Sequence, residues 1–207
     1  MKFINGWWLP DQEQHLCLHL ADHGEYQQEN RRWALAGLEP GGVAIDVGAH
    51  VGLWLRDLCL HFDHVIAVEP VPSHQQCLRQ NVTADNYTVW TCMLGDTASE
   101  AGLKLDPENT GHTHRQGPGL HRVIPLDQVW DSTPVRFIKI DVEGDEVNVI
   151  RGAESVIRTH RPRMCIEQKP HELSEAEGRY AARDLLKAWG YRPLRHRGDD
   201  WVLEHAG

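Results

Sequence analysis

Acidic residues follow the ends of five apolar runs in this chain of 207 residues. Each run has the composition of a buried strand, and helix-like segments lie between most of them. Strands that alternate with helices form a mostly parallel sheet, and such sheets bind ligands at the carboxyl ends of their strands. The acids therefore predict a negatively charged crevice, which suits a cationic ligand and repels a pyrophosphate. They are Asp46, Glu69, Asp96, Asp141 with Glu143, and Glu167.

The loop after the first run indicates which cofactor the crevice holds. The segment VAIDVGAHVG (residues 43–52) has the pattern D-x-G-x-x-x-G. It lacks the middle glycine of the dinucleotide fingerprint G-x-G-x-x-G, which lets the backbone approach phosphate. S-adenosylmethionine fits better, because acidic surroundings favour its ammonium and sulfonium groups, and Gly48 would permit close approach of its methionine part. The expected cofactor contacts in this loop are Asp46, Gly48, Ala49, His50 and Gly52.

The second and third strand ends complete the expected cofactor site. Glu69 lies 23 residues beyond Asp46, at the position from which a carboxylate accepts both ribose hydroxyls. Pro70 follows it, and Gly95 and Asp96 follow the third strand. Taken singly, a helix-capping Asp46 or a solvated Glu69 is an equally good explanation. The two acids at this spacing favour the cofactor.

The fourth strand carries the main catalytic candidates. With S-adenosylmethionine as the expected cofactor, the expected chemistry is methyl transfer, an in-line displacement that needs alignment, a base or metal, and exclusion of water. Lys139 and Asp141 share one face of this strand. We expect Asp141 to act as the base or to hold the methionine ammonium, and Lys139 to be a buried ion-pair partner that lowers the pKa of the acids. Glu143 is a further candidate, although an acid at a helix N-terminus explains it equally well.

Two more sets of residues offer alternatives. His112 and His114, in the segment GHTHRQGPGLH, could supply a base that titrates near neutral pH, although most of the 14 histidines are expected in loops or at the surface. Asp141, Glu167 and Gln168 form an oxygen set that suits Mg²⁺ and that resembles catechol-type O-methyltransferases. A plain hydrogen bond from Glu167 to substrate or to Lys169 is the favoured interpretation, so no metal is expected.

Seven strand-like runs must position these residues. They cover residues 43–47, 64–70, 87–93, 135–141, 163–168, 191–195 and 201–205. The last two runs have no helix between them, which predicts an antiparallel hairpin at the sheet edge with its turn at RGDD. Helices are expected over residues 51–62, 73–82, 146–159 and 172–190.

The N-terminal part is predicted to be helical and to precede one domain. Asp11 can cap a helix that runs toward Ala21, and a second helix spans residues 26–38. Residues 1–40 would then form a helical extension, and residues 41–207 a Rossmann-like core. Trp7 and Trp8 either stack on a sugar or, as we favour, dock this N-terminal arm onto the domain.

Residues 135–168 resemble the signature block of the FkbM-type methyltransferases. The block contains K-I-D-V-E-G at residues 139–144, a G-A step at 152–153, R-P at 161–162 and the closing Glu167. IDVGAHVG and VIAVEP resemble the first two motifs of this family, and NTG and IPLDQV its connecting segment.

This resemblance implies a fold and an activity. The fold is the class I S-adenosylmethionine-dependent methyltransferase sheet, seven-stranded with a reversed last strand. The activity is O-methylation of a sugar or another small hydroxylated metabolite. One residue departs from the family pattern, since His50 stands where Asn is more usual. The N-terminal helices match the family weakly, and the substrate is expected to depend on these helices.

Composition limits the remaining possibilities. A net charge of −9 argues against a nucleic-acid binder, including an RNA methyltransferase. No apolar run is long enough to span a bilayer, and the N-terminus lacks the features of a signal peptide. Five scattered cysteines without CxxC, with Cys92 and Cys165 in strand-like runs, predict a reducing, cytoplasmic compartment. An NAD-type oxidoreductase and a non-catalytic cofactor-binding module are the alternatives, and the acceptor and oligomeric state stay open.

Overall fold

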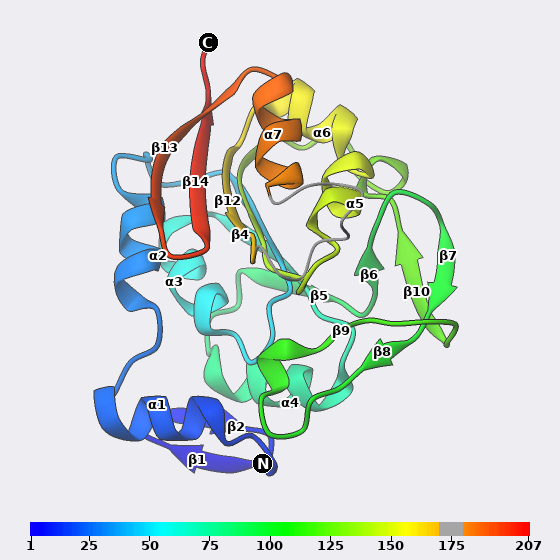
Figure 1. Cartoon of the computed structure of the whole chain (residues 1–207). Coiled ribbons are helices and arrows are strands. Elements are labelled where there is room, and N and C mark those ends of the chain that lie inside the picture. Colours follow the sequence, from blue (N-terminus) through cyan, green and yellow to red (C-terminus); the bar gives the residue numbers. More distant parts are fainter. Residues whose placement is uncertain (170–179) are drawn as a thin grey trace.

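A seven-stranded sheet forms the centre of the protein, with helices on both faces (Figure 1). The computed structural model describes residues 1–169 and 180–207. Five neighbouring strands are parallel, and the last two form an antiparallel hairpin at one edge. This arrangement confirms the predicted α/β class, the strand number and the edge hairpin. In spatial order the strands are β13 (Tyr191–Arg197), β14 (Asp200–His205), β12 (Arg163–Glu167), β11 (Val135–Ile140), β3 (Val43–Val47), β4 (His64–Val68) and β5 (Tyr87–Trp90).

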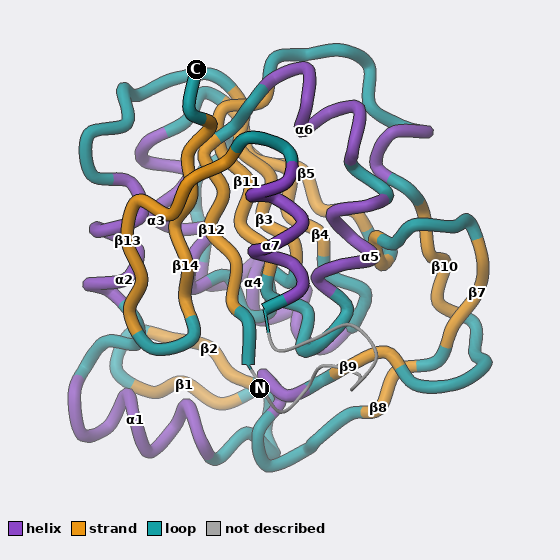
Figure 2. Tube along the Cα trace, turned by 45° about the horizontal axis from the view of Figure 1, so that its top comes forward, coloured by secondary structure: helices purple, strands orange, loops and turns teal. Residues whose placement is uncertain are grey.

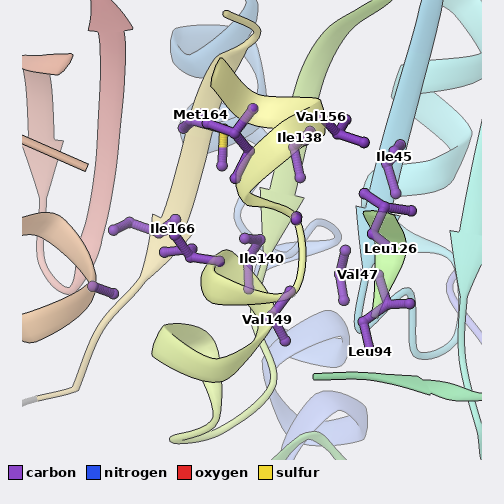
Figure 3. Close-up of a cluster of buried hydrophobic side chains, with 14 of the residues drawn as sticks. Ile45, Val47, Leu94, Leu126, Ile138, Ile140, Val149, Val156, Met164 and Ile166 are labelled. Carbon is purple, nitrogen blue, oxygen red and sulfur yellow. The ribbon is translucent and has the colours of Figure 1, made fainter. Parts of the chain in front are cut away.

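Both faces of the sheet are buried, as the continuous apolar runs predict for parallel strands. On one face Ile45, Val47, Ile138 and Ile140 pack in a cluster with three helices (Figure 3). The alternate positions along the same strands point to the opposite face and meet the other three helices. Figure 2 shows α5 and α6 on one side of the strands and α2 and α3 on the other. The first set is α5 (Glu146–Arg151), α6 (Glu154–His160) and α7 (Ala181–Ala188), and the second is α2 (Gln28–Leu35), α3 (Leu53–His61) and α4 (Pro72–Asn81).

The predicted third strand is wrong in its length. β5 ends at Trp90, where the backbone N–H of Glu69 donates to the Trp90 carbonyl. Alternate residues of a parallel strand bond the same neighbour, so Val71 would donate next, but its N–H donates to Glu69 Oε1 at 2.8 Å and the ladder stops. The chain then leaves the main sheet, and Met93–Leu94 becomes β6 of a separate three-stranded sheet. The other elements of this connecting region are β7 (Ser99–Ala101), β8 (Leu103–Lys104), η1 (Thr110–His112), β9 (His114–Arg115), β10 (His121–Ile124) and η2 (Leu126–Gln128).

The N-terminal arm begins with a hairpin that was not predicted. β1 (Lys2–Ile4) pairs with β2 (Trp7–Leu9) through Asn5 and Gly6, both at positive φ. Asn-Gly between apolar residues is a strong hairpin signal, so the sequence carried the information. Trp7 is 1% exposed and packs with residues of the core domain, which confirms the predicted docking role.

The predicted helix start at Asp11 is wrong. Helix α1 (His15–His23) begins later, and Asp11 instead pairs with the N-terminal amine at 2.8 Å. Glu13 supplies the acceptor at this helix start, because its Oε1 accepts a hydrogen bond from the backbone N–H of Leu16. The second helix, α2, is shorter than the predicted span of residues 26–38.

Two further helix predictions need revision. The helix expected at residues 146–159 is divided into α5 and α6 at Gly152. A Cβ at Gly152 would lie 1.9 Å from the Gly95 carbonyl oxygen, so the close approach of these two segments requires glycine. Of the helix expected at residues 172–190, the part before residue 180 lies outside the described residues.

The predicted cysteine chemistry agrees with the structure, because all five cysteines are free, with Cys92 and Cys165 buried. Within residues 1–169 and 180–207, no helix combines the length and apolarity needed to cross a bilayer.

Candidate active site

A cavity of about 310 Å³ lies at the carboxyl ends of β3, β4, β11 and β12. The strand order reverses between β3 and β11, which is where open α/β sheets bind their ligands. Of the predicted site residues, the wall contains Gly48, Ala49, His50, Glu69, Pro70, His112, Asp141, Glu143 and Glu167. The predicted residues outside this wall are Asp46, Gly52, Gly95, Asp96, His114 and Gln168.

The first loop is held against the end of β11. Gly48 has φ +81°, and a Cβ there would lie 1.9 Å from the carbonyl oxygen of Asp141. Its own carbonyl accepts a hydrogen bond from Lys139 Nζ at 3.0 Å. Gly48 therefore allows the loop after β3 to contact the end of β11, and it also lines the cavity. Gly52 instead begins helix α3 and packs against Leu78 and Val82.

Lys139 is the buried ion-pair partner that the sequence predicted. Its Nζ lies 3.6 Å from Asp46 Oδ1 and 3.3 Å from Asp141 Oδ2. Burial alone would lower the pKa of Lys139, but the Asp141 and Asp46 carboxylates outweigh this and raise the pKa above its usual value. The lysine is therefore charged and balances the two acids.

Asp46 is a buried support for the site. Its side chain is 0% exposed, and among the described residues no hydrogen-bond donor reaches either of its carboxylate oxygens. Burial raises the pKa of Asp46 to about 6, even though the Lys139 charge opposes the shift. Lys139 thus lowers the pKa of Asp46 as predicted, but desolvation is the larger effect and the net shift is upward.

A cluster of acids and one lysine lines the far side of the cavity. Carboxylate oxygens of Asp141, Glu143 and Glu167 lie within 4.8 Å of one another. Lys169 Nζ donates to both oxygens of Glu143, at 2.7 and 2.6 Å, and lies 3.0 Å from Glu167 Oε2. This pairing of Glu167 with Lys169 agrees with the favoured interpretation of Glu167.

The proton in this cluster belongs to Glu167. Burial, reinforced by the Asp141 charge, raises the pKa of Glu167 to about 10. Burial would also raise the pKa of Asp141, but the Lys139 ammonium and a hydrogen bond from Glu167 outweigh it and lower the pKa. The two pKa values are therefore shifted in opposite directions, which favours Asp141 over Glu167 as the ionised member of the pair.

The alternative metal-ligand set does not assemble as predicted. Gln168 is 1% exposed, and its Oε1 accepts a hydrogen bond from the backbone N–H of Arg183 in α7. The amide therefore faces away from Asp141 and Glu167. The acid that does approach these two is Glu143, and Lys169 lies among all three.

Glu146 was missed from the sequence, although it shapes the loop that carries Glu143. Its Oε1 accepts hydrogen bonds from the backbone N–H groups of Val142 and Gly144, at 3.2 and 3.0 Å. These bonds hold Glu143 and Gly144 at positive φ, 57° and 109°. Burial raises the pKa of Glu146 to about 7. Glu146, and not Glu143, is thus the acid in the first turn of α5.

Glu69 is buried, whereas the sequence suggested a solvent-facing strand end. It is 4% exposed, and its oxygens accept hydrogen bonds from the backbone N–H groups of His50 and Val71, each at 2.8 Å. The His74 ring lies 3.2 Å from Oε1. The carboxylate is fixed in place, and it keeps lone pairs directed at the cavity that it lines.

The N-terminal arm contributes residues that the sequence did not indicate. His15, Leu16, Tyr26 and Gln27 all line the cavity. Burial, with the nearby charges of Glu167 and Asp141, raises the pKa of Tyr26 to about 12, so its hydroxyl keeps its proton. No local motif marks these residues, because they reach the site only through the docking of the arm.

The two histidine candidates lie at the rim. A second cavity, also of about 310 Å³, is lined by Lys104, Asp106, His112, His114 and Glu143. His112 and Glu143 border both cavities, while His114 borders only the second. The two cavities therefore adjoin at His112 and Glu143.

The sheet order and the crevice at the switch point together define a Rossmann-like methyltransferase fold. Residues 46–193 match the FkbM methyltransferase domain, and the chain belongs to this family. The family confirms the predicted class, a methyltransferase, and its cofactor, S-adenosylmethionine.

Similar proteins are known from both sequence and structure. The chain is 26% identical over 141 residues to the hexuronic acid methyltransferase AglP of Haloferax volcanii, a match that covers 64% of this chain and 59% of that protein. The structure of the methyltransferase FkbM from Methylobacillus flagellatus KT is 22% identical with a TM-score of 0.57, and the match covers 91% of this chain and 52% of that one. A Streptococcus mutans protein in complex with S-adenosylhomocysteine is 10% identical with a TM-score of 0.54, covering 85% and 94% of the two chains. This chain therefore spans only part of the first two relatives.

Proposed function

We propose that the protein transfers the methyl group of S-adenosylmethionine to a hydroxyl of a sugar or another small metabolite. The observation that carries this proposal is the position of Asp141 in the wall of the switch-point cavity, with Lys139 Nζ 3.3 Å from its Oδ2. An ionised carboxylate at the switch point can accept the proton of an acceptor hydroxyl. The name of the AglP relative supports a sugar acceptor.

The wall residues suit this cofactor. Glu69 is fixed by two backbone N–H groups, and its remaining lone pairs suit the two hydroxyls of a ribose. Asp141 at the end of β11 favours a bound ammonium or sulfonium, because opposite charges attract strongly at a site shielded from water.

The protein residues have separate parts in the reaction. When bound, the cofactor supplies an activated methyl carbon, whose bond to sulfur breaks as its bond to the acceptor oxygen forms. Asp141 takes the hydroxyl proton, and Lys139 keeps that carboxylate ionised before the transfer. Tyr26 retains its phenolic proton and can donate a hydrogen bond to the acceptor from the opposite, N-terminal side.

The acceptor enters through the second cavity in this proposal. Lys104 would be the cationic partner there for a substrate carboxylate, beside the acids Asp106 and Glu143, and His112 and His114 offer ring nitrogens. A hexuronic acid has such a group, which agrees with the name of the relative. We also propose that residues 1–207 act as one domain in the cytoplasm, which the five free cysteines support.

The test is a turnover assay with a panel of acceptors. The purified protein is incubated with S-adenosylmethionine and either hexuronic acids, neutral hexoses or catechols, and S-adenosylhomocysteine is quantified with and without EDTA. We expect turnover with a sugar acceptor that survives EDTA. Loss of turnover in EDTA would instead assign a divalent cation to Asp141, Glu143 and Glu167.

Calorimetry separates the remaining outcomes. Binding of S-adenosylhomocysteine without turnover on any acceptor would support a non-catalytic cofactor-binding module. An absence of binding would overturn the proposed function altogether.

A further inference from the structure

The N-terminal arm is fastened to the loop that carries η1. The backbone N–H groups of Gln14 and His15 both donate to the carbonyl of Glu108, at 2.9 and 3.1 Å. This arm lies outside residues 46–193, the part of the chain that matches the family. The contacts between the arm and the loop adjoin the cavity that holds the cofactor in the proposed function.

Glu13 is the buried centre of this contact. Its side chain is 0% exposed, and within the described residues no cation lies at ion-pair distance from it. Its Oε1 accepts a hydrogen bond from Leu16 N at 2.7 Å, and its Oε2 accepts from Thr110 N at 2.6 Å and from Thr110 Oγ1 at 2.5 Å. A buried carboxylate is tolerated only when hydrogen bonds satisfy it, and these three donors do so.

The number of available protons decides the direction of the next hydrogen bond. Backbone N–H groups can only donate, so Glu13 is the acceptor, and the single hydroxyl proton of Thr110 goes to it. Thr110 Oγ1 must then accept from the atom 2.8 Å away, which is Nε2 of His50. His50 therefore carries a proton on Nε2.

The other ring nitrogen is left without a proton. Burial, followed by the neighbouring His74 and Lys139, holds the pKa of His50 well below its ordinary value, so the ring is neutral. A neutral ring with a proton on Nε2 has a bare Nδ1, which can only accept hydrogen bonds. His50 lines the cavity beside Glu69, to which its backbone N–H donates.

We propose that Glu13 is a positioning residue that acts through Thr110 to hold His50 as the Nε2–H tautomer, so that Nδ1 accepts a hydrogen bond from a ribose hydroxyl of the cofactor. The identity of the ligand rests on the proposed function, but the tautomer does not. Glu13, which does not line the cavity, thus acts on the cofactor through two side chains, Thr110 and His50.

The test reads the tautomer directly. Two-bond and three-bond proton–nitrogen correlation NMR on the full chain without ligand identifies which ring nitrogen of His50 carries the proton. We expect Nε2–H in the wild-type protein and in Thr110→Ser, which keeps the hydroxyl. Thr110→Val removes the acceptor for Nε2, and Glu13→Ala frees the Thr110 hydroxyl to donate to His50, so both variants should populate Nδ1–H.

Cofactor affinity provides the second readout. Titration calorimetry with S-adenosylhomocysteine should show affinity about 3- to 10-fold weaker in Thr110→Val, the scale of one hydrogen bond, and restored in Thr110→Ser. Thr88→Val is a matched control, because Thr88 Oγ1 pairs with His64 Nε2 at 3.1 Å at an exposed site away from the cavity. It should leave both the His50 tautomer and the affinity unchanged.

The two proposals can fail separately. A wild-type His50 with its proton on Nδ1, or a Thr110→Val variant with the wild-type tautomer, overturns the positioning role even if the cofactor binds. Wild-type protein that shows Nε2–H but binds no S-adenosylhomocysteine overturns the proposed function and leaves the role of Glu13 in place. If Glu13→Ala does not fold, Thr110→Val still decides the question.

Discussion

Lys139 Nζ lies 3.6 Å from Asp46 Oδ1 across the parallel strands β11 and β3, which bring these two residues side by side in the sheet. The same ammonium lies 3.3 Å from Asp141 at the cavity wall. One buried charge therefore joins a support inside the sheet to the proposed base. Several consequences of this arrangement, and of the loops around it, can be measured.

Lys139→Met should destabilise the fold by about 3–5 kcal/mol, because it leaves Asp46 as an unpaired buried acid. It also removes the hydrogen bond to the Gly48 carbonyl. Urea unfolding followed by circular dichroism measures the loss. Arg136→Met, on the same strand but partly exposed, is the control and should cost much less. A loss for Lys139→Met no larger than that of the control would contradict the structural role.

Asp46→Asn should change how stability depends on pH. The folded-state pKa of Asp46 is raised from 3.8 to about 6, so between these values the folded protein binds more protons than the unfolded chain. The contribution of Asp46 to the free energy of unfolding therefore decreases as pH rises from about 4 to about 6. Asp46→Asn has no group that titrates at this position, so its free energy of unfolding lacks this decrease. The free energy of unfolding of Asp46→Asn minus that of wild type should rise over this window by roughly 3 kcal/mol, at about 1.4 kcal/mol per pKa unit. Urea titrations at several pH values measure it, and a flat difference would refute it.

Glu69→Gln should weaken the binding of S-adenosylhomocysteine by about 10- to 100-fold, because hydrogen bonds to a charged acceptor contribute about 1.5–3 kcal/mol. Gln is chosen because Ala would leave the buried donors of His50 and Val71 without an acceptor and would itself affect folding. Calorimetry measures the affinity, and a thermal melt checks the fold. Glu100→Gln, at an exposed acid, is the control. Wild-type affinity in Glu69→Gln would remove Glu69 from the ribose site.

Asp141→Asn should reduce the single-turnover rate by about 10²–10⁴-fold, the usual scale for a general base. Cofactor affinity should fall much less, and both quantities are measured on the same preparation. If rate and affinity fall together, Asp141 holds the methionine ammonium instead. The exposed Asp131→Asn provides a control for the loss of one negative charge. Wild-type rate and affinity would direct attention to Glu143 and His112.

Gly48→Ala should destabilise the protein by more than about 2 kcal/mol, because the residue needs positive φ and its Cβ would lie 1.9 Å from the Asp141 carbonyl oxygen. Cofactor affinity should also fall, since the loop must move away from β11. Gly111→Ala is the matched control, where the nearest atom to the added Cβ is Asn109 Oδ1 at 3.4 Å. Chemical unfolding of both variants makes the comparison, and similar losses would show that the clash is relieved elsewhere.

The main sheet could be predicted because its strands are continuous apolar runs with turns between them. The same logic placed acids at the strand ends, and the structure brings Glu69, Asp141 and Glu167 to one cavity. The role of an acid was harder to predict where its side chain could point either to the cavity or to the helices that cover the sheet. Asp46 lies inside its strand and faces the helices, so its burial decides its role.

The contribution of the N-terminal arm could not be predicted from local patterns. Glu13 meets Thr110, which lies 97 residues later in the chain. Glu13 belongs to no motif, the NTG segment that contains Thr110 does not reveal its partner, and helix and strand periodicity does not indicate which loop an arm will dock against. The hairpin turn at Asn5–Gly6 does have a local sequence signal, because Asn-Gly favours the positive φ angles that the turn needs.

The hairpin at the end of the chain also protects the molecule from its own copies. β13 is an outer strand, and its free edge would otherwise offer unpaired backbone groups to another sheet. It contains Pro193, which has no N–H, an irregular register between Pro193 and Arg195, and three arginines that repel a second β13. The opposite edge, β5, has only four residues. Both edges thus resist strand-to-strand aggregation, and the protein should stay dispersed at the high concentrations that the NMR and calorimetric measurements require.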